Sequence, residues 1–130
     1  MTGLETAEYL AARGNSVKVL EMLPAPGRGI FNFNVTKTVN ALEKQRTEIY
    51  TCTRADSISK EAVTVTDTRS GRSEEIPCDV VVLAIGVYTD HSMRDMLEKR
   101  FFNVTEIGDA NKAGKIMTAV RDGYDRIKVL

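Results

Sequence analysis

The chain has 130 residues, and its 18 basic residues are balanced by 18 acidic ones, so the formal net charge is zero. This balance gives no electrostatic sign of the basic surface through which proteins bind nucleic acid or anionic membranes. The hydrophobic share of 42% suits about one globular domain. No apolar run approaches the roughly 20 residues of a membrane span and the N-terminus has no signal-peptide pattern, so we expect a cytoplasmic protein with a small-molecule partner.

The first 22 residues carry the pattern of half a βαβ unit. Apolar spacing predicts a helix from Thr2 to Arg13, and a mostly apolar strand, Val17 to Met22, follows it. Glu21 closes this strand, 18 positions after Gly3. In dinucleotide-binding folds the last glycine of the fingerprint lets the helix pack on the sheet, and an acid roughly 20 residues later binds the ribose. The first strand and two earlier glycines of such a fingerprint should precede Met1, so we expect a sheet that lacks its first strand.

The Glu21 carboxylate indicates which nucleotide is bound. A carboxylate at this position can accept two hydrogen bonds from the ribose diol, and its charge repels a 2′-phosphate. Met22 follows it, and the nearest arginine, Arg28, lies further along a loop rich in proline and glycine that spans residues 23–29. The sequence therefore favours NAD(H) over NADP(H).

The middle of the chain predicts a covering helix and then a small antiparallel meander. The helix starts with Asn32 or Asn34 as its N-cap and runs to about Gln45. From residue 47 to residue 76 the apolar period changes to two, which is typical of antiparallel strands with one solvated face. Cys52 and Cys78 are isolated, with no C-x-x-C pair and no neighbouring histidine, so we expect small buried hydrophobes and no metal site.

The last third of the chain predicts a return to the main sheet. The continuous apolar run Asp79 to Gly86 reads as a central parallel strand, and Gly86 could let the backbone approach a ligand or simply form a turn. A short helix between residues 88 and 99 and a strand over residues 101–107 follow. His91, the only histidine, lies in a polar stretch and is interpreted as a loop residue rather than a base.

The segment Gly108-Asp109-Ala110 precedes a helix expected from Ala113 to Leu130. Asp109 would place a carboxylate just ahead of that helix, where it can cap the helix or accept a hydrogen bond from a ligand hydroxyl. The basic residues between 112 and 115 oppose the helix dipole at this end, so their position is better explained if an anion binds beside them than if none does.

Four sequence blocks in this order, GLETAEYLAARG, VKVLEM, IPCDVVVLAIGV and EIGDANKAGKIMTAVRDGY, resemble the C-terminal region of a known family. These are the NADH:flavin oxidoreductases of the 2,4-dienoyl-CoA reductase, enoate reductase and trimethylamine dehydrogenase type. The resemblance implies an α/β, Rossmann-like FAD/NAD(P)-binding three-layer fold, with a parallel sheet, helices, a small antiparallel meander and the first strand missing. It also implies an NAD(P)H-binding domain over residues 1–99 and the C-terminal segment of the FAD-binding domain over residues 100–130.

The resemblance assigns roles to residues. Gly3, Glu5 and Glu21 would bind the pyridine nucleotide, with Ala84 to Val87 at the floor of the site. Gly108 and Asp109 would belong to the flavin motif, where the aspartate holds the ribityl chain. With the loop residues, the candidate cofactor-binding residues are Gly3, Glu5, Glu21, Met22, Arg28, Ala84, Gly86, Gly108 and Asp109.

The leading hypothesis is a dinucleotide-binding module in an enzyme that passes hydride from NADH to FAD, and onward to an enoate or dienoyl-type substrate. No catalytic residue is expected within the chain, so the isolated chain should not turn over. FAD and the partner flavin-binding and barrel domains would belong to the full assembly. Two alternatives stay open: a scaffold that binds an adenine nucleotide without redox chemistry, and a folded fragment that binds nothing well. A sheet without its first strand would also expose apolar surface and invite homodimers.

Overall fold

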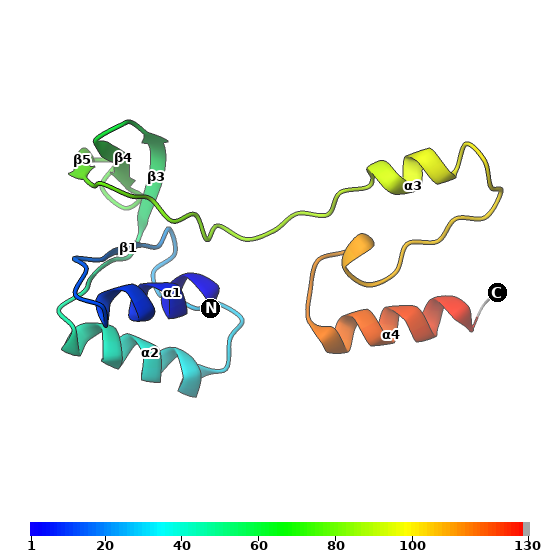
Figure 1. Ribbon diagram of the computed structural model, residues 1–130, viewed down its shortest axis with the longest axis horizontal. Helices are drawn as coiled ribbons and strands as arrows, with labels where there is room; N and C mark the ends of the chain where they lie inside the picture. Colours follow the sequence, from blue (N-terminus) through cyan, green and yellow to red (C-terminus); the bar gives the residue numbers. More distant parts are fainter. Residues whose placement is uncertain (129–130) are drawn as a thin grey trace. The chain divides into compact units, whose positions relative to one another are not determined.

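The computed structural model describes residues 1–128 and divides into two compact units, Met1–Ala84 and the residues from Ile85 onward. Figure 1 traces the chain through helices and strands of the first unit and then through the short helices of the second. The division at residues 84 and 85 follows contacts between residues. The boundary between residues 99 and 100 that the resemblance implies concerns cofactor binding, and it stays a prediction.

The first unit begins with the expected helix and strand. Helix α1 spans Thr2–Ala11 and strand β1 spans Lys18–Leu20, and helix α2 (Asn32–Lys44) then leads into strand β2 (Glu48–Tyr50). Strands β1 and β2 pair in parallel, with Val19 opposite Ile49. The alternating pattern of residues 47–53 had placed β2 in the antiparallel meander, and this was wrong because parallel or antiparallel pairing depends on which strand lies alongside.

Helices α1 and α2 cover one face of the parallel pair. Leu4, Ala7 and Leu42 are buried there, and the partly buried side chains of Val17, Val19, Val35 and Ile49 pack against them. The expected N-cap of α2 was also wrong. Phe31 is the N-cap residue and makes no side-chain capping bond, while Asn32 is already helical.

The predicted meander is present and covers the other face. Strands β3 (Thr53–Ile58), β4 (Ala62–Asp67) and β5 (Ser73–Pro77) form an antiparallel sheet in the order β3-β4-β5. A cluster of Val63, Val65 and Ile76 packs against Leu20 and Tyr50. Because Leu20 and Tyr50 alternate with Val19 and Ile49 along the strands, the parallel pair is buried between helices and meander, as a three-layer arrangement requires.

The segment Asp79–Gly86 is the main departure from the prediction, since none of it is a strand. Val80, Val82 and Leu83 are exposed despite being apolar. A strand exists only through hydrogen bonds to a neighbour, and among residues 1–128 β1 pairs with β2 alone. The apolar run therefore has the composition of a central strand without a described partner that would make it one.

The described part of the second unit contains two helices and a 3₁₀ turn. Helix α3 spans Ser92–Leu97, the 3₁₀ turn η1 spans Gly108–Ala110, and helix α4 spans Ile116–Ile127. The strand expected over residues 101–107 does not form, for the same lack of a neighbour, and α4 begins three residues later than expected. Its expected last two residues, 129 and 130, lie outside the described part of the chain.

His91 lies outside the helices, as expected, and is the N-cap residue of α3. Its Nδ1 lies 2.8 Å from the Glu106 carboxylate, which also meets the Arg94 guanidinium at 3.3 Å. This carboxylate ties the start of α3 to the segment that leads into η1. Within residues 1–128, no helix has the length and apolarity needed to cross a membrane.

Candidate functional site

Glu21 follows β1 directly and lies at its carboxyl end, the edge where open α/β sheets bind ligands. Its backbone is fixed on both sides: its N–H donates to the Tyr50 carbonyl at 2.8 Å, and its carbonyl accepts from the Thr53 N–H at 2.9 Å. Its Oε1 accepts from the Leu23 N–H at 2.9 Å. The carboxylate is thus held in one orientation, and its second oxygen has no protein partner among the described residues.

Gly3 and Ala84 are brought together although they are 81 positions apart in the chain. A Cβ added at Gly3 would lie 2.8 Å from the Cβ of Ala84, which is closer than two carbon atoms can pack. The start of α1 therefore approaches the segment before Gly86 closely only because residue 3 is glycine. Both residues were candidates from the sequence.

The N-terminus of α1 has free donors. Its N-cap residue, Met1, makes no side-chain capping bond, so the amides of the first turn are not capped by a side chain. Glu5 lies in this first turn and is exposed, where its charge is favourable for the helix dipole. A ten-residue helix with uncapped amides can accept a phosphate group at this end.

The loop after β1 packs against α2. A Cβ at Gly27, which has φ of +78°, would lie 2.6 Å from a methyl carbon of Val35. The neighbouring candidates Met22 and Arg28 are both exposed on this loop. Neither side chain makes a hydrogen bond or ion pair that fixes it in the described part of the chain, so the structure gives each of them no defined role beside Glu21.

The remaining candidates lie in the second unit. Gly86 has φ of +102°, which favours glycine, and apart from its own chain neighbours no heavy atom lies within 4 Å of the position where its Cβ would be. Asp109 lies inside η1 and not next to the first turn of α4, which has Lys115 as its N-cap residue. Of the two roles left open for Asp109, capping of α4 is not the one observed, since its Oδ1 accepts from the Gly114 N–H at 3.2 Å, one residue before the N-cap residue.

Asp122 is a residue of this region that the sequence reasoning missed. Its Oδ2 accepts from the Gly108 N–H at 2.9 Å and from Asn111 Nδ2 at 3.1 Å, and these bonds hold η1 against α4. The Asn111 hydrogen bond, with the Gly108 amide, lowers the pKa of Asp122. Asp122 lies on the helix face of Ala119, whose Cβ is 3.2 Å from the Cβ position of Gly108, but this proximity comes from the fold and no local sequence pattern reports it.

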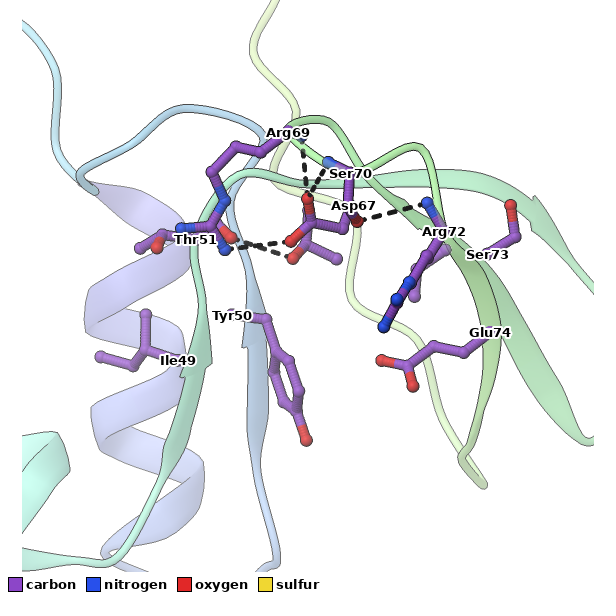
Figure 2. A pocket seen from close by; sticks show the side chains of 11 residues that line it. Ile49, Tyr50, Thr51, Asp67, Arg69, Ser70, Arg72, Ser73 and Glu74 are labelled. Atoms are coloured by element: carbon purple, nitrogen blue, oxygen red, sulfur yellow. Dashed lines mark hydrogen bonds and ion pairs between the residues drawn. The ribbon is translucent and has the colours of Figure 1, made fainter.

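A second missed feature is a cleft in the first unit, beside the end of β2 (Figure 2). Tyr50 and the β4–β5 turn line it, with a cavity volume of about 570 Å³. The charges there are partly paired, since the Asp67 carboxylate accepts from the Arg69 guanidinium at 3.0 Å and from the Ser70 amide at 2.8 Å. The Arg69 hydrogen bond is the main reason that the pKa of Asp67 is lowered.

No metal centre is indicated by the residues that the structure describes, since none of their His, Cys, Asp and Glu side chains gather in groups of three or more. Cys52 is buried and Cys78 is half-buried, and both are free thiols.

Comparison with known proteins gives consistent matches. Residues 1–114 match a family described as "Pyridine nucleotide-disulphide oxidoreductase". A bilirubin reductase of Mediterraneibacter gnavus (strain CC55_001C) is 32% identical, covering 100% of this chain and 20% of that protein. An NADH oxidase of Thermoanaerobacter brockii is 30% identical over 95% of this chain and 19% of its own length.

Solved structures include a similar region. The 6-hydroxypseudooxynicotine amine oxidase of Pseudomonas geniculata N1 superposes with a TM-score of 0.78 at 29% identity, over 94% of this chain and 19% of that one. The chain thus spans about a fifth of the length of these relatives.

Proposed function

Because the chain belongs to the pyridine nucleotide-disulphide oxidoreductase family, we propose that it is the NAD(H)-binding module of a flavin-dependent NADH oxidoreductase. Membership makes it a dinucleotide-binding oxidoreductase module with the Rossmann-like α/β fold predicted from the sequence. The proposal adds the preference for NAD(H), FAD in the full assembly, and an enoate or dienoyl-type substrate. A cytoplasmic location is part of the same proposal.

The orientation of Glu21 is the observation that carries the proposal. One carboxylate oxygen is held by the Leu23 amide, and the other is left for a ribose hydroxyl at the carboxyl edge of the parallel pair. The absence of a side chain at Gly3 supports the same site, because it allows the start of α1 to pack directly against Ala84, where a Cβ at residue 3 would clash. These features fit an adenosine diphosphate, with the ribose on Glu21 and the pyrophosphate at the α1 amides.

The chain's own contribution would be binding and orientation. The bound nicotinamide would supply a hydride, and the flavin of the assembly would receive it. In the second unit, the exposed Asp109 carboxylate has one oxygen held by the Gly114 amide, which leaves the other for a ribityl hydroxyl. Asp122 would keep the Gly108–Ala110 turn in place for that contact.

A nucleotide titration tests the proposal. We expect the chain to bind NADH more tightly than NADPH, and Glu21→Gln to remove this preference while keeping an acceptor for the Leu23 amide. Loss of a charged hydrogen bond to a sugar is worth roughly 1.5–3 kcal/mol, so NADH affinity should fall about ten- to a hundred-fold. Glu43→Gln, at an exposed position on α2, is the matched control.

The outcomes separate the alternatives. Binding of NADH that survives Glu21→Gln unchanged would contradict the ribose contact. Equal affinity for ADP and NADH would favour a scaffold that binds adenine nucleotides, and absence of binding by either would favour a fragment with no site of its own. NADH oxidation by the chain alone with added FAD would contradict a module that only binds and orients.

The exposed apolar surface supports the proposed partner domains. Ile85 is 90% exposed and Val87 is 83% exposed, and the α4 residues Ile116, Val120 and Tyr124 are also largely exposed. Soluble proteins cover such surface, so further flavin-binding and barrel domains, or a second copy, should bury it. Strictly monomeric behaviour of the isolated chain in size-exclusion chromatography at high concentration would count against this.

A further inference from the structure

The cleft beside β2 has the features of a ligand site distinct from that of Glu21. It lies where β2 turns into β3 and faces the β4–β5 turn and the start of β5 (Figure 2). Its volume of about 570 Å³ is within the range of small-molecule sites. None of the nine candidate cofactor residues lines it, so the dinucleotide site does not account for it.

One wall of the cleft is the ring of Tyr50. The ring packs at the edge of the Val63, Val65 and Ile76 cluster, and its hydroxyl donates to the Glu48 carboxylate. This hydrogen bond is the main cause of a raised pKa of Tyr50. The ring is therefore held at its far end and offers an uncharged aromatic face.

The opposite wall carries one donor group and one acceptor group. Figure 2 shows the Arg72 guanidinium and the Glu74 carboxylate pointing into the same gap as the Tyr50 ring. Among residues 1–128 neither side chain forms an ion pair with another protein group, whereas the Asp67 carboxylate nearby is already satisfied by Arg69. The two carboxylates and two guanidinium groups that line the cleft balance in charge, and the Glu48 carboxylate on the Tyr50 hydroxyl adds one negative charge at its edge.

This chemistry selects a class of ligand. Because it has no excess of positive charge, the cleft gives no preference to a phosphate or another strong anion. An aromatic face beside a guanidinium and a carboxylate suits a planar heterocycle with adjacent acceptor and donor edges. Guanine has this arrangement, because its O6 and N7 accept from arginine and its N1 and N2 donate to a carboxylate.

We propose that the cleft between Tyr50, Arg72 and Glu74 binds an uncharged purine of the guanine type. The ring stacks on Tyr50, the Arg72 guanidinium donates to O6 and N7, and the Glu74 carboxylate accepts from N1 and the exocyclic amine. Hydroxyl groups of Thr51, Ser70 and Ser73 line the rim and can meet the sugar of a nucleoside. The site does not depend on nucleotide binding at Glu21.

The test is a titration of the whole chain, uniformly labelled with ¹⁵N, with guanosine followed by NMR. We expect saturable shifts of the amides of Tyr50, Arg72 and Glu74, with an affinity near the millimolar range that suits a shallow cleft. Inosine, which has no exocyclic amine, should bind more weakly than guanosine, and uridine should bind more weakly still because a pyrimidine offers less stacking area. Shifts confined to other residues, or uridine binding as well as guanosine, would overturn the proposal.

Variants test each wall. Tyr50→Leu keeps an apolar contact with the meander cluster but removes the stacking face, so guanosine affinity should fall about five-fold or more. Tyr50→Phe keeps the face and should bind almost as wild type. Glu74→Gln should lower guanosine affinity to the level of inosine, whereas Glu75→Gln, on the opposite face of β5, should change nothing. A Glu75→Gln variant that loses as much affinity as Glu74→Gln would show a general charge effect and would refute the assigned contacts.

Discussion

The close approach of α1 to residue 84 makes a quantitative prediction for Gly3→Ala. The new Cβ would lie 2.8 Å from the Ala84 Cβ, whereas carbon atoms in contact prefer about 3.5–4.0 Å. Overpacking of this kind costs about 1–3 kcal/mol, and we take the lower end because Ala84 lies on an exposed segment that can move. Alanine gains up to about 1 kcal/mol over glycine in a helix interior, and less in the first turn. The two effects oppose each other.

A double-mutant cycle separates them. In the Ala84→Gly background the facing methyl is absent, so Gly3→Ala should show only the helix gain and should stabilise the chain. In the wild-type background the clash cancels that gain. We therefore expect a coupling of about 1 kcal/mol between the two positions, measured as free energy of unfolding in urea.

Gly123→Ala provides the comparison. Residue 123 lies inside α4, and its added Cβ would lie 3.7 Å from Ile107 Cδ1, an ordinary contact. This substitution should stabilise α4 by about 0.5–1 kcal/mol. If Gly3→Ala stabilises the chain equally with and without the Ala84 methyl, then α1 does not approach that segment, and the contact between Gly3 and Ala84 is not part of a binding site.

Three further predictions concern the buried side chain of Leu42 and the carboxylates of Asp67 and Asp122. Leu42→Ala, at a fully buried position, should cost roughly 2–5 kcal/mol in urea unfolding, while Leu83→Ala at an exposed position should cost almost nothing. The pKa of Asp67 is lowered in the fold, chiefly by the Arg69 hydrogen bond, so its stabilisation is complete above the unfolded value near 3.9 and is lost as pH falls below it. Asp67→Asn should remove that part of the acid dependence, and an unchanged slope between pH 5 and 3 would contradict it. Asp122→Ala should speed hydrogen exchange at the Gly108 amide, Asp122→Asn less so, and equal protection in both variants would argue against that bond.

The sequence predicted best where a pattern reports on local structure. The spacing of Leu4, Ala7 and Leu10 gave α1 to within two residues, and the apolar run before Glu21 gave β1. Glu21 could be placed at the end of a strand because the apolar run stops there and a loop rich in proline and glycine follows. The contact between Gly3 and Ala84 is long-range, and it was anticipated only by assigning both residues to one site through a family resemblance.

The failures concern structure that depends on a neighbour. Residues 79–86 and 101–107 have strand composition, but composition does not provide the hydrogen-bonding partner that makes a strand. The alternation over Glu48–Tyr50 correctly predicted a strand and wrongly predicted its direction, for the same reason. Asp122 was missed because its role comes from a turn 14 residues away, which no local pattern reports.

The Glu21 site and the cleft share a piece of backbone, which has a thermodynamic consequence. The β2–β3 turn donates the Cys52 N–H to Leu23 at 3.0 Å and the Thr53 N–H to Glu21 at 2.9 Å, and the same turn lines the cleft through Thr51 and Thr53. A ligand that changes this turn changes the loop that orients the Glu21 carboxylate. Coupling between binding sites is reciprocal, so any factor by which guanosine alters NADH affinity must equal the factor by which NADH alters guanosine affinity. If instead the apparent affinity for NADH falls without limit as guanosine is raised, rather than reaching a plateau, then the two ligands compete for one site and the two-site description is wrong.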